Sequence, residues 1–203
     1  MAKRSGRPSR EDMTTDTKQL IIDTTIDLIK KEGADAITVR NVCSACDLSI
    51  GTFYHYFRDK DDLLMFFLNE LPFENCSLKT ARSDIAERIC ELYMKLINRY
   101  MDLGLDFMKS FYSTSNRSLS AYMGAEAEEF APNTVMARCE KELKEAQDHG
   151  FIPSECAPHE LSKDICSIVK GCVFEWCLCS RAMDIEDTLL RILTRYFKGV
   201  FAH

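Results

Sequence analysis

Ten cysteines and four histidines are the side chains of this 203-residue chain whose spacing could support metal or redox chemistry. Cys43 and Cys46 have the two-residue separation of metal and redox motifs, but no second cysteine or histidine pair is spaced to complete a site. A second group follows His159: Cys166, Cys172, Cys177 and Cys179. Helical geometry scatters these four over several faces, so we expect them to pack as small apolar side chains. A thiol sensor at Cys177 or Cys179 stays open as an alternative.

The sequence carries no recognisable catalytic set. It has no glycine-rich phosphate loop, no nucleophile elbow and no His-Glu-x-x-His run. His149 and His159 flank an expected loop at 151–158, where we expect solvated side chains. The acidic run Glu126, Glu128 and Glu129 is typical of an exposed face. We therefore expect neither an enzyme nor a bound metal or cofactor.

Charge is divided unevenly along the chain. The net charge of -6 discourages a nucleic-acid partner, yet residues 1–60 carry 10 Lys and Arg against 9 Asp and Glu. The first ten residues contain Lys3, Arg4, Arg7 and Arg10 and no acid. The chain is thus basic at its start and acidic behind it.

Composition is that of a folded globular protein, with 46% hydrophobic and 29% charged residues. The longest apolar run, Leu63 to Leu68, is too short to cross a membrane, and the basic N-terminus is followed by no secretory signal. We expect a cytoplasmic protein with no membrane partner.

Apolar periodicity predicts an all-α fold. Capping residues and stop signals, such as Thr38, Ser49, Asp59 and Gly33, set the expected boundaries. The expected helices cover 15–32, 38–45, 50–56, 59–71, 81–103, 105–130, 133–149, 159–183 and 185–201.

Two short helices joined by a brief turn, behind a longer helix, form the layout of a helix-turn-helix. In the second short helix, Phe53 and Phe57 are four residues apart and can anchor it in a core. Its other face offers small or hydrogen-bonding groups to a DNA major groove: Ile50, Gly51, Thr52, Tyr54, His55 and Tyr56. Ser49 begins this helix, whose free N–H groups favour a phosphate, and Lys60 supplies a second backbone contact. Thr38 begins the preceding helix, where Arg40 can reach a base or a phosphate.

These positions resemble the DNA-binding domain of TetR-type (TetR/AcrR) transcriptional regulators. The similarity covers residues 16–65 and rests on Thr38-Val-Arg40, Leu48-Ser49, Gly51 to Phe57 and Lys60, behind a helix ending at Gly33. It implies that residues 50–56 are the recognition helix. It also implies that Thr52, Tyr54, Tyr56 and Lys60 mostly hold phosphates, while Arg40 and residues 50–52 face bases.

Two positions depart from the family pattern. Asp47 stands where the turn usually has glycine, and aspartate tolerates a left-handed backbone better than most residues. Ile50 stands where a polar or basic residue is frequent, and it would contact a thymine methyl group or nothing. The departure at Ile50 affects which operator sequence the protein would recognise.

The basic arm at residues 3–10 contains Gly6-Arg7-Pro8, which resembles the core of minor-groove hooks. The alternative is a disordered, solubilising tail. If the arm binds DNA, deletion of residues 2–10 should weaken DNA binding and flatten its salt dependence. A solubilising tail predicts unchanged affinity at low and high salt.

The resemblance implies a DNA-binding domain at 1–59 and a ligand-binding and dimerisation domain at 60–203. The last two helices carry apolar stripes that suit packing against a second copy, in a homodimer on a pseudo-palindromic operator. The middle helices would enclose a pocket for a small apolar or amphipathic effector. Its candidate lining residues are Phe66, Tyr93, Phe107, Met108, Phe111, Tyr122, Met123, Phe174 and Trp176.

Three hypotheses follow. The first is a dimeric DNA-binding regulator, most simply a repressor, released by a ligand. The second is the same regulator switched by cysteine oxidation. The third is a helical enzyme or interaction module that does not bind specific DNA.

Overall fold

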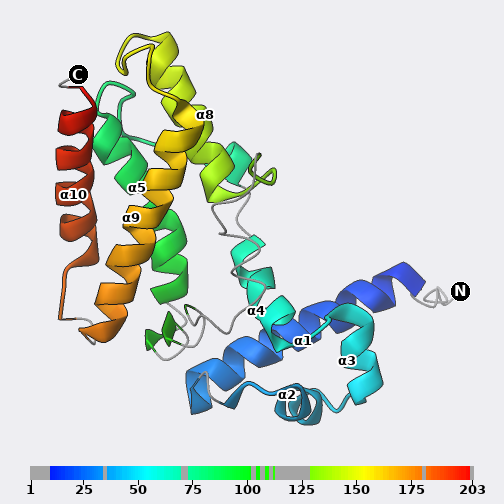
Figure 1. The fold of residues 1–203 in the computed structure, drawn as a ribbon. Helices are drawn as coiled ribbons and strands as arrows, with labels where there is room; N and C mark the ends of the chain where they lie inside the picture. The colour runs from blue at the N-terminus through cyan, green and yellow to red at the C-terminus, as the bar shows by residue number, and fades with distance from the viewer. Residues whose placement is uncertain are drawn as a thin grey trace, which may run out of the picture.

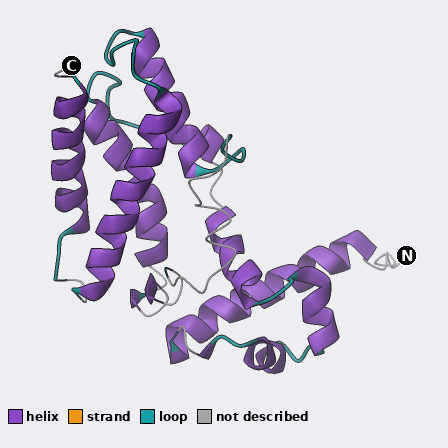
Figure 2. Ribbon diagram, in the orientation of Figure 1, coloured by secondary structure: helices purple, strands orange, loops and turns teal. Residues whose placement is uncertain are grey.

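The computed structural model describes residues 10–33, 36–69, 73–101, 104, 105, 108, 109, 112, 129–179 and 182–201, and within these ranges every regular element is a helix. In chain order they are α1 (Arg10–Glu32), α2 (Val39–Ala45), α3 (Ile50–Tyr56), α4 (Lys60–Asn69), the short 3-10 helix η2 (Phe73–Asn75), α5 (Ile85–Met101), α8 (Val135–Asp148), α9 (Pro158–Leu178) and α10 (Ile185–Val200). Figure 1 shows α1, α2 and α3 grouped at one end, α4 leading away from them, and α5, α8, α9 and α10 packed as a bundle. In Figure 2 the regular elements of the described residues are all coloured as helix, which agrees with the expected all-α fold.

Side-chain caps place the two short helices where the sequence predicted them. The hydroxyl of Thr38 accepts a hydrogen bond from the Asn41 amide at 3.1 Å and begins α2. The hydroxyl of Ser49 accepts one from the Thr52 amide at 3.0 Å and begins α3. Such caps satisfy amides that the first helical turn leaves without a carbonyl partner.

Several other predicted boundaries were wrong by a few residues. Helix α1 begins at Arg10, five residues before the expected start. Helix α8 begins after Thr134 because Asn133 has a φ of 63°, which is not helical. Helix α9 includes Pro158, which the first helical position tolerates.

The remaining boundaries also moved inward. Helix α5 covers 85–101 rather than 81–103, α9 ends at Leu178 rather than Met183, and α10 ends at Val200 rather than Phe201. The expected helix at 105–130 lies mostly outside the described residues, as do residues 1–9 of the basic arm.

The apolar stripes of the last two helices are buried within the chain itself. Ile165, Val169 and Trp176 of α9 and Leu189 and Phe197 of α10 are each no more than 2% exposed. They form one core with the inner face of α5. The prediction that these side chains face a second copy was therefore wrong, because the bundle of one chain already covers them.

A buried ion cluster joins the bundle to the segment after α4. The Glu142 carboxylate of α8 is 1% exposed and lies 2.6 Å from Arg88 Nε and 2.6 Å from Arg138 Nη2. Arg88 also donates to the Thr80 carbonyl, and Arg138 donates to the Glu74 carbonyl at 2.5 Å. Residues 74–80 are thereby held against α5 and α8.

Candidate nucleic-acid interface and ligand pocket

The turn between α2 and α3 is built on a left-handed residue. Asp47 has a φ of 55°, so it takes the conformation expected for the position where the family usually has glycine. The Leu48 amide then donates to the Cys43 carbonyl at 2.9 Å and closes the turn. This geometry sets the direction in which α3 leaves α2.

One face of α3 is buried. Phe53 is 1% exposed and Phe57, just after the helix, is 3% exposed, with their ring centroids 5.6 Å apart. Lys18 of α1 lies over the Phe57 ring, with Nζ 5.6 Å from its centroid. Both predicted anchors are therefore in the core.

The opposite face of α3 presents two large apolar side chains to solvent. Ile50 is 48% exposed and Tyr54, four residues on, is 55% exposed. Gly51 and His55 are also exposed, while Thr52 and Tyr56 are partly covered. The Thr52 hydroxyl lies 2.8 Å from the Ser49 hydroxyl. A short helix with this outer face suits contact with base edges and phosphates.

Cationic and polar groups border this face. Arg40 on α2 and Lys60 at the start of α4 are exposed. Arg58 is exposed too, but its guanidinium lies 3.1 Å from the Asp62 carboxylate, and this hydrogen bond raises the pKa of Arg58 further. The structure thus brings the predicted DNA-contact residues of 38–60 to one end of the molecule (Figure 1).

The Cys43 and Cys46 thiols take part in packing. Both are buried, and their sulfurs lie 3.7 Å from the Ser49 carbonyl and 3.9 Å from the Leu20 carbonyl, respectively. Burial, with Cys46 nearby, raises the pKa of Cys43. Across the described ranges, no group of three or more metal-ligating side chains is placed to hold an ion.

Four of the nine predicted ligand-pocket residues have side chains that the structure describes: Tyr93, Met108, Phe174 and Trp176. Tyr93 and Met108 are fully buried core residues, and Phe174 is 55% exposed on the outside of α9. The assignment of Phe174 was wrong because a helix turns by about 100° per residue, and its neighbour Val173 takes the inward position. Phe107, Phe111, Tyr122 and Met123 lie outside the described residues, and for Phe66 of α4 only the helical backbone is described.

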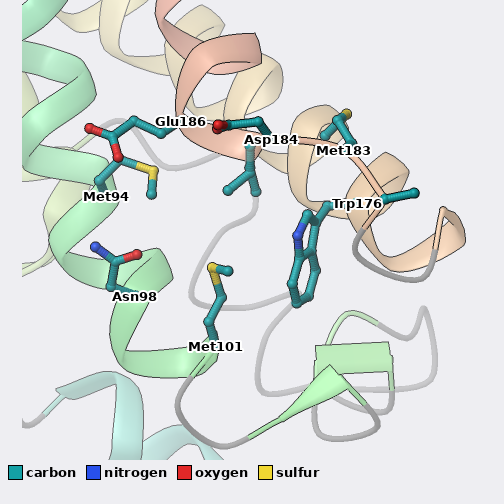
Figure 3. A pocket seen from close by; sticks show the side chains of 9 residues that line it. Met94, Asn98, Met101, Trp176, Met183, Asp184 and Glu186 are labelled. Atoms are coloured by element: carbon teal, nitrogen blue, oxygen red, sulfur yellow. The ribbon is translucent and has the colours of Figure 1, made fainter.

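Of those candidates, Trp176 lines a cavity that described residues form. The cavity has a volume of about 450 Å³ and lies where the ends of α5 and α9 meet the start of α10 (Figure 3). Its lining residues are Met94, Asn98, Met101, Trp176, Ala182, Met183, Asp184, Ile185 and Glu186.

Sequence reasoning missed most of this lining. Met94, Asn98 and Met101 recur at intervals of four and three residues, which is a helical face, but that spacing looks the same for a core and for a cavity. Asp184 caps α10: its carboxylate accepts a hydrogen bond from the Asp187 amide at 3.0 Å.

Comparison with known proteins bears on the α1–α4 region first. Residues 21–65 match the family model described as "Bacterial regulatory proteins, tetR family". This match identifies residues 21–65 as a TetR-type DNA-binding domain. TetR-family proteins are transcriptional regulators, a class that is not enzymatic.

A curated relative supports the same domain. The chain is 35% identical over 69 residues to the HTH-type transcriptional repressor KstR of Mycolicibacterium smegmatis. This stretch covers 34% of the chain and 33% of KstR. The match therefore spans about a third of that repressor's length.

Solved structures of the TetR family share the fold over most of the chain. FadR from Thermus thermophilus, a TetR-family repressor in complex with lauroyl-CoA, superposes with a TM-score of 0.59 at 14% identity, covering 89% of this chain and 92% of FadR. The multidrug binding protein EbrR, complexed with imidazole, gives 0.57 at 15% identity and covers 97% of both chains. At these identities the likeness shows the TetR fold alone.

In the part of the chain that the structure describes, no helix is both long and apolar enough to span a membrane.

Proposed function

We propose that this chain is a dimeric repressor of the TetR family that binds a pseudo-palindromic operator and is released from it by a small apolar or amphipathic molecule. The observation that carries the proposal is the outer face of α3, where Ile50 and Tyr54 are about half exposed on a helix whose other face is anchored by Phe53. A protein surface gains nothing from exposing such residues side by side, whereas a DNA groove can cover them.

The proposed contacts divide into two kinds. Arg40, Ile50, Gly51 and Thr52 face base edges, with the Ile50 side chain suited to a thymine methyl group. The phosphate contacts come from Thr38, Ser49, Thr52, Tyr54, His55, Tyr56 and Lys60, so Thr52 belongs to both groups. Phosphate contacts fix the register of α3, and the base contacts select the sequence.

We propose that residues 1–59 bind DNA and that residues 60–203 bind the effector and form the dimer. Such a protein acts in the cytoplasm, where a bacterial chromosome lies. The basic arm at 3–10 would add minor-groove contacts beside α1.

The outer surface of α9 and α10 supports dimerisation. Phe174 and Leu178 are 55% and 62% exposed on the outer side of α9. Gly171, on the same side, and Gly199 of α10 have nothing within 4 Å of where a Cβ would lie. Glycine weakens a helix, so its use at two open positions suits close approach of a second chain's helices. Two heads held in this way can read two half-sites about one DNA turn apart.

Effector coupling would pass through the segment after α4. Residues 74–80 are tied to α5 and α8 by Arg88 and Arg138, so a change in the bundle is transmitted to α4 and then to the DNA-binding head. A ligand that fits one head spacing better than another would shift the population away from the DNA-bound form. TetR-fold relatives with bound small molecules support this role, including FadR with lauroyl-CoA.

The thiols give little support to switching by oxidation. Burial raises the pKa of Cys177, and the hydrogen bond of the Cys179 thiol to Glu175, 3.3 Å long, raises the pKa of Cys179. Sensor thiols are instead held as thiolates by a lowered pKa. Retention of the response by a variant with both Cys177→Ser and Cys179→Ser would discard oxidation as the signal.

A pull-down from fragmented genomic DNA of the source organism tests the proposal. The wild-type chain should enrich a few palindromic fragments, whereas Tyr54→Ala and Lys60→Ala should not. Equal enrichment by all three proteins would reduce the interaction to non-specific charge attraction and refute the proposal.

A further inference from the structure

The cavity beside Trp176 continues along α5. A second hollow of about 430 Å³ shares Met94, Asn98 and Glu186 with the first, so the two form one groove between α5 and the start of α10. Each volume falls within the range of about 300–1,000 Å³ typical of small-molecule sites. The groove is therefore large enough for a ligand with two chemically different ends.

One wall of the groove is apolar and polarisable. Met94, Trp176 and Ile185 are buried, and Figure 3 shows the Trp176 ring and the Met101 side chain facing the space between α5 and α10. Thioether and indole groups adapt to varied apolar shapes, and an indole face also attracts cations.

The other wall is acidic. Asp184 and Glu186 are the charged residues of the described lining beside Trp176, and both are carboxylates. In the neighbouring hollow, Lys95 is the one cation among the described lining residues, and its Nζ lies 3.9 Å from Glu91. Among the described residues, no cationic group lies within 4.0 Å of the Glu186 carboxylate.

We propose that this groove binds a cationic amphipathic molecule. Its ammonium or comparable group lies at Glu186 and Asp184, its apolar part lies against Met94, Met101 and Trp176, and the Asn98 amide is available to a polar atom between them. The two carboxylates disfavour an anionic ligand such as an acyl-CoA. Binding of this molecule in the groove does not depend on the proposed function. Its role as the effector that releases the protein from DNA does.

Three octyl compounds of different charge test the ligand class. Octyltrimethylammonium, octyl sulfate and octanol have the same apolar chain, and each is titrated calorimetrically into the full chain below its micelle concentration. We expect the cation to bind at least about tenfold more tightly than the anion, a difference of about 1.4 kcal/mol. The chain has one tryptophan, so binding should also change the Trp176 fluorescence. Equal affinities, or tighter binding of the sulfate, would overturn the inference.

Paired variants test the location. The double variant Asp184→Asn/Glu186→Gln removes both charges but keeps a side chain that can cap α10. It should lose the preference for the cation while its affinity for octanol stays within about twofold, which also shows that the groove is still folded. The matched control Glu74→Gln/Glu155→Gln alters exposed carboxylates outside the groove and should keep the preference. An unchanged preference in the groove variant would overturn the assignment.

These titrations contain no DNA, so they separate the ligand site from regulation. A cation that binds as expected but leaves the protein on its enriched DNA fragments would contradict the effector role and leave the site intact. Specific DNA enrichment without any cation preference would leave the regulator intact and remove the proposed ligand class.

Discussion

Gly51 shows how a single residue can be required by a partner and not by the protein's own packing. A Cβ at this position would meet only the Ser49 hydroxyl oxygen, at an ordinary 3.6 Å. The backbone there is helical, so glycine is not needed for its conformation. Its exposed position beside Ile50 points to close approach of another molecule.

Replacement Gly51→Ala should therefore affect stability and DNA binding in opposite directions. Alanine favours the helix and should leave the free energy of unfolding unchanged or raise it by up to about 1 kcal/mol. The added methyl group should weaken operator binding at least about fivefold. Urea unfolding and a DNA titration of the same preparation measure both quantities. Loss of stability without loss of binding would contradict the role given to Gly51.

Among the elements, the short helices were the most predictable. Thr38, Asp47 and Ser49 encode caps and a turn locally, so the bounds of α2 and α3 followed from the sequence. The partners of longer helices are not local information. Periodicity identified the apolar stripes of α9 and α10, but it does not tell whether the same chain or a second chain covers them. The sequence also assigned an inward position to Phe174, whereas its neighbour Val173 is the buried residue.

The buried ion cluster was also hidden from the sequence, because it joins α5, α8 and the 74–80 segment over large separations. Replacement Glu142→Gln should destabilise the chain by about 3–5 kcal/mol, since Arg88 and Arg138 would lose their buried counter-charge. Urea unfolding measures this cost. Glu140→Gln on the same helix removes a partly exposed carboxylate near His159 and should cost less than about 1 kcal/mol. Equal losses of unfolding free energy in the two variants would show that the buried ion cluster does not hold α5, α8 and residues 74–80 together.

The loop before α5 should make stability depend on acid. Burial opposes ionisation of Glu91, but hydrogen bonds from the Lys79 and Thr80 amides and the Thr80 hydroxyl outweigh it, so the pKa of Glu91 is lowered. Because the pKa of Glu91 is lower in the folded state, the ionised carboxylate stabilises the fold at pH values above the unfolded-state pKa of 4.5. This stabilisation is lost as the pH falls through the folded-state pKa.

Glu91→Gln should accordingly reduce the free energy of unfolding by about 1–2 kcal/mol at pH 7. The difference from the wild type should shrink steadily below about pH 4.5. Unfolding curves of both proteins across this range measure it. A difference that stays constant with pH would mean that the Glu91 charge does not hold the loop.

Among the described residues, the outer side of α9 is an apolar surface that the chain itself leaves uncovered. Gly171, Phe174 and Leu178 lie along it, and the buried stripes have no free area to offer. The dimer that the proposed function requires would therefore form through this outer side of the helix.

Replacement Gly171→Trp should shift the protein towards monomer, because the indole would occupy the space where two helices approach. The dimer dissociation constant should rise at least about tenfold by sedimentation equilibrium. The same bulky change at the exposed Lys144 of α8 is the control and should leave the dimer intact. A stable dimer in both variants would place the interface elsewhere.

An anisotropy titration measures whether α3 reads a DNA sequence. The wild-type chain is titrated onto an enriched operator fragment and a shuffled fragment of the same composition, beside Tyr54→Ala and a control, Phe151→Ala, which removes another exposed aromatic ring. We predict that the wild type prefers the operator by about a thousandfold or more, that Tyr54→Ala weakens operator binding at least about tenfold, and that Phe151→Ala changes nothing. Equal affinity of the wild type for both fragments, or equal losses in the two variants, would contradict this role of α3.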